Sequence, residues 1–325
     1  MAPDAFSRRD AVAGAGVLIG AAMITAGPGT GSRGMAQAPP DRLPVTEIAD
    51  GVFVHEGAHE LAAPANRGDI ANLSFVIGRD AVAVVDTGGS AAVGEALRAA
   101  IRAVTGKPVR YVINTHMHPD HVFGNAAFTG DRPEFVGHRN LPRALASRAG
   151  HYLAVNETLL GDRAFAGTRL IGPTRLVQGR ETLQLGDRQL ILEAQPTAHT
   201  DNDLTVLDPA TGTLFLGDLL FIGHIPVLDG SIRGWLALMA RLAPIPAERV
   251  VPGHGAPAAA WPQAMQPQER YLETISAEVR HMIRQGRSIA EAATTVGLSE
   301  KDAWLLFDAF NARNVTAAFA ELEWE

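Results

Sequence analysis

The sequence comprises 325 residues, of which 46% are hydrophobic and 19% are charged, as in ordinary folded globular proteins. This length allows one large domain or two smaller ones. The net charge is −7, and the body of the chain has no cluster of lysine and arginine, which argues against a nucleic-acid-binding surface. Because there is no cysteine, any metal site has to use histidine and carboxylate side chains.

The amino-terminal segment has the pattern of an export signal. Arg8 and Arg9 form a twin-arginine pair, and an apolar run rich in alanine and glycine follows at 11–27. This run is too short for a convincing membrane span, and Ala36-Gln37-Ala38 offers a cleavage site. Residues 1–38 therefore resemble a twin-arginine (Tat) signal peptide, which predicts a periplasmic protein without stable membrane insertion after cleavage. The alternative is an uncleaved amphiphilic tail or anchor.

The first part of the predicted domain contains a linker and three strands. Residues 39–50 are expected to be the linker, and 52–55 alternates like an edge strand. Two apolar strands follow at 73–78 and 81–85, joined by a tight turn. The chain thus begins its folded part with strands that pair locally.

A glycine-rich turn separates these strands from a predicted helix at 91–104, which Ser90 is placed to cap. The turn at 86–90 lacks the spacing of a dinucleotide loop or a P-loop, so phosphate binding is a weak interpretation. Asp86 can instead accept a hydrogen bond from a metal-bound imidazole. The order of strand, helix and strand is typical of an α/β protein.

A hydrophobic strand at 109–113 leads directly into the strongest functional signal of the chain. His116, His118 and His121 place three imidazoles, and Asp120 places one carboxylate, within six residues. These groups suit zinc, with iron and manganese as alternatives. A solvated polar loop is the other interpretation, but the spacing favours chelation.

The second half of the domain repeats the pattern of an apolar strand that ends in a polar residue. Strands at 213–217 and 249–253 end in Asp218 and His254, and glycine beside each lets the backbone approach closely. His199 lies in a polar stretch after a predicted hairpin. The other elements predicted in the domain are a short helix or turn at 122–128, a helix at 139–160, the hairpin at 183–192, and a strand at 203–208.

Residues 262–325 are predicted to form a helical extension of the domain at 39–261. The expected helices are at 266–285, 288–296 and 300–311, the last capped by Ser299. An acidic C-terminal end and the lack of clustered basic charge argue against DNA recognition by these helices. Isolated polar residues elsewhere are interpreted as surface or packing residues, and these are His55, His59, His151 and Tyr152.

The pattern His116-x-His118-x-Asp120-His121, continued by three later residues, resembles the metallo-β-lactamase-fold hydrolase superfamily. The resemblance covers about residues 50–260. It implies an αβ/βα sandwich, followed here by the helical extension, with the site at one edge between two sheets. By this resemblance His116, His118 and His199 bind one metal, Asp120, His121 and His254 bind a second, and Asp218 bridges both.

The implied cofactor is a pair of zinc ions, with iron or manganese possible in their place. Two divalent ions roughly 3.5–4 Å apart can share a water molecule and lower its pKa. The resulting hydroxide can attack a carbonyl carbon, while Asp120 orients it and shuttles its proton. The prediction is a dinuclear zinc hydrolase that acts on an ester, thioester, lactone or amide in a small-molecule substrate.

Asp218 narrows the resemblance within the superfamily. True β-lactamases usually carry cysteine or serine near this position, whereas a bridging aspartate resembles the thioesterase, glyoxalase II and lactonase-like branches. A mononuclear iron sulfur dioxygenase keeps similar residues and stays an alternative. The flavodiiron branch is disfavoured, because its motif carries glutamate at the position of His118.

Two further segments, 67–73 and 221–230, resemble a periplasmic subgroup described as quinoprotein relay system zinc metallohydrolases, or sulfur-oxidation-type (SoxH-like) hydrolases. This resemblance implies a possible quinoprotein dehydrogenase partner. The second interpretation of the chain is an accessory protein of such a system, which binds metal or a ligand without turnover. His224 is expected to reach the substrate or its oxyanion as a catalytic residue. Asp229 and Arg233 are weaker candidates for the same cleft.

Overall fold

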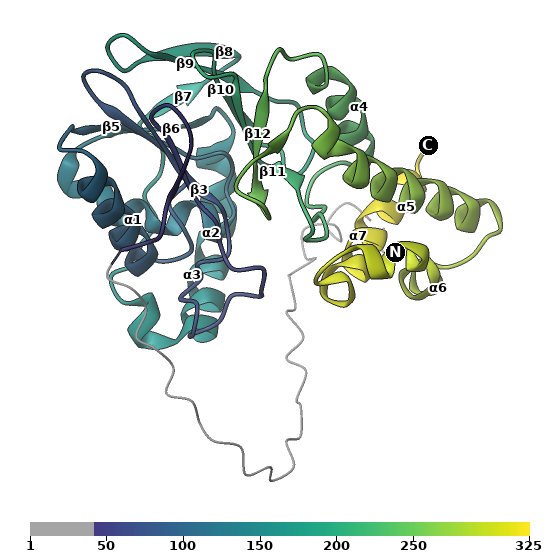
Figure 1. Cartoon of the computed structure of the whole chain (residues 1–325). Helices are drawn as coiled ribbons and strands as arrows, with labels where there is room; N and C mark the ends of the chain where they lie inside the picture. The colour runs from purple at the N-terminus through teal and green to yellow at the C-terminus, as the bar shows by residue number, and fades with distance from the viewer. Residues whose placement is uncertain (1–41) are drawn as a thin grey trace, which may run out of the picture. The chain divides into compact units, whose positions relative to one another are not determined.

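Two β-sheets pack face to face, and helices cover the outer face of each, in the computed structural model of the chain (Figure 1). The structure describes residues 42–325, which belong to one compact unit, Ala38–Glu325. The layers are those of the αβ/βα sandwich, so the predicted fold class is confirmed. The predicted signal peptide lies outside the described residues, and the predicted boundary after residue 261 stays a prediction.

The first sheet contains, among the described residues, seven strands in sequence order. They are β1 (Thr46–Ala49), β2 (Val52–His55), β3 (Leu73–Ile77), β4 (Val82–Val85), β5 (Val109–Ile113), β6 (Glu134–His138) and β7 (Arg175–Val177). Neighbours pair antiparallel from β1 to β4 and parallel from β4 to β7. The predicted linker is wrong in part, because β1 takes the edge position expected for β2. Gly51, with a φ of +64°, allows the tight turn between them.

The second sheet follows in the chain and also keeps sequence order. Its strands are β8 (Arg180–Gln184), β9 (Gln189–Ala194), β10 (Leu204–Asp208), β11 (Thr213–Phe221), β12 (Arg249–His254) and β13 (Ala259–Ala260). β11 and β12 pair parallel, and the other neighbours pair antiparallel. The predicted hairpin is confirmed as β8 and β9. β11 is longer than predicted, because it continues through Asp218 to Phe221.

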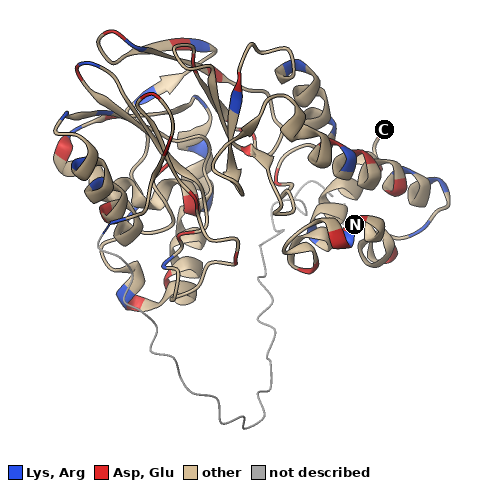
Figure 2. Ribbon diagram, viewed as in Figure 1, with Lys and Arg blue, Asp and Glu red and all other residues tan. Residues whose placement is uncertain are grey.

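The helices between residues 42 and 325 are α1 (Ala91–Val104), α2 (Pro119–Val122), the 3-10 helix η2 (Phe123–Asp131), α3 (Leu141–Phe165), α4 (Ile232–Leu242), η3 (Gln263–Met265), α5 (Gln266–Arg284), α6 (Ile289–Thr295), η4 (Leu298–Ala303) and α7 (Phe307–Leu322). Ser90 caps α1 as predicted, since its side chain accepts a hydrogen bond from Val93 N. In this part of the chain none of the helices is long and hydrophobic enough for a membrane span. Acidic and basic residues are interspersed along the helices and strands (Figure 2).

The sequence missed one helix, and one predicted helix is wrong. α4 was not predicted, although Ser231 caps it by accepting a hydrogen bond from Gly234 N. The helix predicted at 300–311, with its cap at Ser299, is instead the short η4, an extended break and α7. The break arises because the main chain of Leu305 forms a bridge with His224, which no local pattern reveals.

Three apolar layers hold the sandwich together. The inner faces of both sheets share one cluster, which includes Val85 and Ile113 of the first sheet and Leu192 and Phe215 of the second. A second cluster lies between the first sheet and α1, and a third joins the second sheet to α4, α5, α6 and α7. The C-terminal helices therefore pack directly on the sheet that carries Asp218.

Candidate metal centre

The polar residues singled out in the sequence meet at one edge of the sandwich. His116 and His118 lie in the loop that leaves β5, and Asp120 and His121 lie in the short helix α2 that follows. His199 comes from the connection between β9 and β10 of the other sheet. The structure thus brings together side chains that both sheets contribute.

Asp218 and His254 reach this edge from the parallel pair β11 and β12. The pairing of these strands is irregular around Gly217, whose φ of +51° suits glycine. Gly253 packs so closely that an added Cβ would lie 1.9 Å from Asp218 Oδ1. Gly253 therefore makes room for the carboxylate and Gly217 for the side chain of Thr115, so the backbone approaches closely at both glycines, as the sequence predicted.

Four side chains form a first group with donor atoms within 4.8 Å of one another. His118 Nδ1 lies 3.0 Å from His116 Nε2 and 3.0 Å from His199 Nε2. Asp218 Oδ2 lies 3.6 Å from His116 Nε2 and 3.4 Å from His199 Nε2. Ligands at the usual zinc distances in a tetrahedron are about 3.3 Å apart, so the spacing suits one zinc-sized ion.

A second group of donors lies around the other carboxylate oxygen of Asp218, Oδ1. Asp218 Oδ1 lies 3.1 Å from His121 Nε2 and 3.4 Å from His254 Nε2. Asp120 Oδ2 lies 3.6 Å from His121 Nε2 and 3.3 Å from His254 Nε2. Asp218 therefore faces both groups, one oxygen each, which is the geometry of a bridging ligand.

Hydrogen bonds on the outer side of the rings fix which nitrogens face inward. His199 Nδ1 donates to Val227 O at 2.6 Å, and His118 Nε2 donates to Asp229 Oδ2 at 2.9 Å. His254 Nδ1 donates to a third acceptor, the carbonyl oxygen of Ile70, at 2.8 Å. A neutral imidazole that donates from one nitrogen keeps a lone pair on the other, so the inward nitrogens are acceptors.

Asp86 orients the remaining two rings, as the sequence predicted for one of them. Its Oδ2 accepts from His121 Nδ1 at 2.8 Å and from Thr115 Oγ1 at 2.7 Å. Thr115 Oγ1 in turn accepts from His116 Nδ1 at 3.0 Å. Asp86 is 2% exposed, so it connects both groups of donors through buried hydrogen bonds.

The donor set fits a bound cation. Five imidazole lone pairs and two carboxylates converge here. All of these atoms are hydrogen-bond acceptors, and too few protons lie between them to connect them by hydrogen bonds. His121 Nε2 and Asp218 Oδ1 are buried and lack a hydrogen-bond partner among the described residues. Unpaired buried polar atoms are rare and costly, and divalent cations would satisfy them. The groups are therefore able to bind divalent metal.

The electrostatics of the two groups differ. Burial lowers the pKa of His199 to about 3, which keeps the ring neutral. For His254 burial acts in the same direction, but the charges of Asp218 and Asp120 outweigh it and raise the pKa to about 9. The second group thus attracts a positive charge, and either a metal cation or a proton supplies it.

His224, the predicted catalytic residue, lies on the flank of the site. Its ring centroid is 5.1 Å from that of His254 and 5.6 Å from that of Phe310 in α7. Its Nδ1 donates to Ile225 O at 2.6 Å, and burial lowers its pKa to about 4. The neutral ring therefore presents an acceptor at Nε2, which does not suit donation to an oxyanion. The catalytic role of His224 stays a prediction.

The weaker sequence candidates divide between the site and the surface. Asp229 is part of the site as the acceptor for His118, a role that the sequence did not reveal. Arg233 instead pairs with Glu325 at 3.2 Å and is largely exposed. Tyr152 is buried with its ring centroid 6.4 Å from that of His118.

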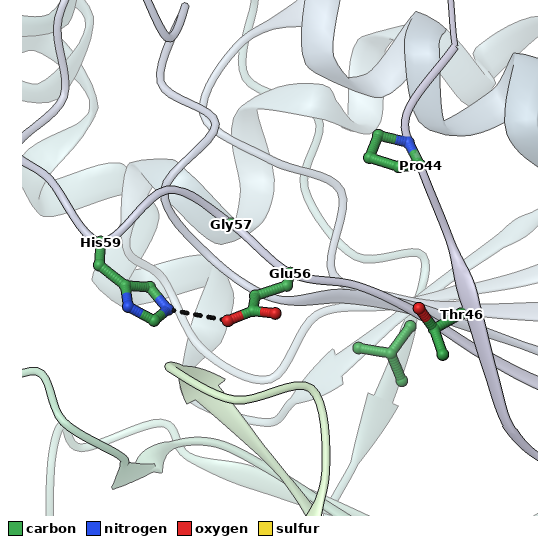
Figure 3. A pocket seen from close by; sticks show the side chains of 6 residues that line it. Pro44, Thr46, Glu56, Gly57 and His59 are labelled. Carbon is green, nitrogen blue, oxygen red and sulfur yellow. Dashed lines mark ion pairs between the residues drawn. The ribbon is translucent and has the colours of Figure 1, made fainter.

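Two of the hollows in the described part of the chain are similar in volume. One, of about 430 Å³, adjoins the first group of donors and is lined by Met117, Arg143, Ala144, Ser147, Arg148, Thr197, Asp201, Asp229 and Gly230. The other, of about 440 Å³, lies beside β1, where Figure 3 shows His59 turned toward Glu56, 3.2 Å away. Neither lining contains a donor residue, but Asp229 in the first hollow accepts the hydrogen bond of His118, so the first is the better place for a substrate.

A family model described as the metallo-beta-lactamase superfamily matches residues 66–254. The chain belongs to this superfamily. This confirms the resemblance seen in the sequence. The acyl-coenzyme A thioesterase MBLAC2 of Gallus gallus is 31% identical over 186 residues, which are 52% of this chain. The chain spans 62% of the length of this curated relative.

Solved structures of other proteins share the fold. A metallo-beta-lactamase from Pontibacter korlensis is 21% identical with a TM-score of 0.58, and the match covers 71% of this chain and 99% of that one. The inverting sec-alkylsulfatase Pisa1 from Pseudomonas sp. is 14% identical with a TM-score of 0.65, and the match covers 86% of this chain and 50% of that one. At these identities the two structures show the common fold alone.

Proposed function

We propose that the protein is a metal-dependent hydrolase whose centre holds two divalent ions, with zinc as the metal. The observation that carries the proposal is the position of Asp218, whose two oxygens face separate groups of donors. A purely structural zinc site is closed and mononuclear, so a bridged pair favours catalysis. When bound, the ions would activate a water molecule and polarise the carbonyl oxygen of the acyl group under attack.

The side chains of the site have separate tasks in this proposal. Asp120 is 19% exposed in its side chain, so it faces both the donor groups and the solvent. It is placed to hold the proton of the attacking water at its free oxygen. His224 lies beside His254, and its task in this proposal is to accept a hydrogen bond from the substrate or the attacking water at Nε2.

The preferred substrate class is an acyl thioester, followed by other esters, lactones and amides. The thioesterase relative supports this order, and so does the hollow of about 430 Å³ beside His118. Met117 gives this hollow an apolar wall, and its rim carries two ion pairs, Arg143 with Asp201 and Arg148 with Asp229. The apolar wall suits an acyl group, and the paired charges at the rim offer polar contacts to the rest of the substrate.

The test measures metal content and turnover on protein purified without added metal. Two zinc ions per chain and hydrolysis of acyl thioesters that stops on chelation are the expected results. One iron with oxygen uptake would point to a sulfur dioxygenase instead. Two metals without turnover across thioesters, esters, lactones and amides would leave the accessory role in a quinoprotein system.

Export to the periplasm and membership of the quinoprotein relay subgroup are part of the same proposal. They rest on the amino-terminal pattern and on the segments 67–73 and 221–230. Replacing Arg8 and Arg9 with lysine should leave the protein in the cytoplasm, measured by fractionation of cells that express the full chain. Unchanged export of this variant would refute the twin-arginine interpretation.

A further inference from the structure

The loop between β11 and α4, residues 222–231, supplies the outer hydrogen-bond acceptors for two of the metal-facing histidines. Val227 O accepts from His199 Nδ1, and Asp229 Oδ2 accepts from His118 Nε2. These bonds set the tautomer and the direction of both rings. The orientation of the first donor group therefore depends on where this loop lies; we call residues 222–231 the acceptor loop.

The C-terminal helices hold the acceptor loop from its other side. In Figure 1, α7 lies beside the end of β11. The main chain of Leu305, just before α7, donates to Gly223 O at 2.8 Å and accepts from Ile225 N at 3.1 Å. The loop is thus paired, strand-like, with a segment some 80 positions later in the sequence.

Asn314 of α7 makes the most specific contact. Its Oδ1 accepts from Leu228 N at 2.9 Å, and its Nδ2 donates to Pro226 O at 2.6 Å. These two partners flank Val227, the acceptor for His199. The side chain is 1% exposed, and its Nδ2 also donates to Tyr271 OH at 3.0 Å. A buried amide that hydrogen-bonds to the main chain on both sides of Val227 fixes the direction of the Val227 carbonyl.

We propose that Asn314 is a positioning residue of the metal centre, through which the C-terminal helices set the orientation of His199. The inference rests on the proposed metal-binding function of the site. Loss of the hydrogen-bond partner of a metal ligand lowers metal affinity roughly 10- to 100-fold. Asn314 is one hydrogen bond further from the metal than such a partner, because it holds the Val227 segment that bonds to His199. We therefore expect Asn314→Leu to weaken metal binding by about 10-fold.

The chain offers a matched control in Asn311, one turn earlier on α7. It is 4% exposed, accepts from Tyr271 OH at 3.0 Å and donates to Val296 O at 2.9 Å, so it belongs to the same buried network. It makes no hydrogen bond to the acceptor loop. Asn311→Leu should therefore disturb the packing of the helices without moving Val227.

The experiment measures zinc affinity by chelator competition, the absorption spectrum of the cobalt-substituted protein, and the urea midpoint of the metal-free protein. Both variants should lose stability, but only Asn314→Leu should weaken zinc binding and shift the cobalt bands. Equal affinity and spectra in the two variants would overturn the inference. If Asn314→Leu does not fold, the same measurements are made on Asn314→Asp. This variant keeps the acceptor for Leu228 N but loses the donor to Pro226 O, so it should also weaken zinc binding. Wild-type protein that binds no zinc would refute the proposed function itself.

Discussion

Asp86 is the position where a single atom change should disturb both donor groups. Its carboxylate accepts three hydrogen bonds, two of them from Thr115 and one from His121. In Asp86→Asn the amide would have to face one of these donors. Thr115 N–H cannot reverse, whereas the Thr115 hydroxyl and the His121 ring can become acceptors. The amide should therefore take the place of Oδ2 and move the His121 proton to Nε2, the metal-facing nitrogen.

The magnitude follows from the role of such outer partners. Losing the outer hydrogen bond of a metal-ligating histidine costs about 10- to 100-fold in metal affinity, or roughly 1.4–2.8 kcal/mol. Backbone strain should not contribute, because Asp86 has a φ of +58°, a conformation that asparagine tolerates well. The expected loss therefore comes from the reversed hydrogen bond and the lost carboxylate charge beside His121, without a contribution from the backbone.

The assay is a chelator competition for zinc on the wild type, Asp86→Asn and the control Asp308→Asn. Asp308 is exposed and pairs with Lys301 at 2.8 Å, far from any donor group in sequence. The control should bind zinc like the wild type, and a urea titration of the metal-free proteins confirms that each is folded. Wild-type affinity in folded Asp86→Asn would refute the reasoning about the His121 tautomer.

Two other substitutions test the site and the fold separately. Asp218→Ala should lose both metals and activity together, because both groups share this carboxylate; full metal content with activity in this variant, measured by elemental analysis and turnover, would disprove the bridge. Asp208→Ala should lower the free energy of unfolding by about 3–5 kcal/mol, since it leaves the buried guanidinium of Arg188 unpaired. Urea denaturation checks this, and a loss no larger than that of Asp308→Asn would show that the buried pair adds nothing.

The parts of the fold that the sequence predicted are those with local causes. The helix at 91–104 carries its own cap in Ser90, and the strands show their burial as short apolar runs. The donor residues were visible for the same reason. Polar side chains directly after buried strands have to lie at a sheet edge, and the spacing at 116–121 suits chelation.

The parts that the sequence missed depend on partners far away in the chain. The helix expected at 300–311 breaks because Leu305 pairs with the main chain of Gly223 and Ile225. The acceptor for His199 is the carbonyl of Val227, and a backbone group leaves no trace in the side-chain pattern. Asp229 was visible as a candidate, but its bond to His118 required the fold of the acceptor loop.

The donors also divide along the chain. Those at 116–121 are attached to the first sheet, whereas His199, Asp218 and His254 belong to the second. Neither half of the sequence completes either group without the other. A chain cut between β7 and β8 would give two fragments that share the inner apolar cluster and that divalent ions would join more tightly, so the same architecture could serve as a split reporter of free zinc.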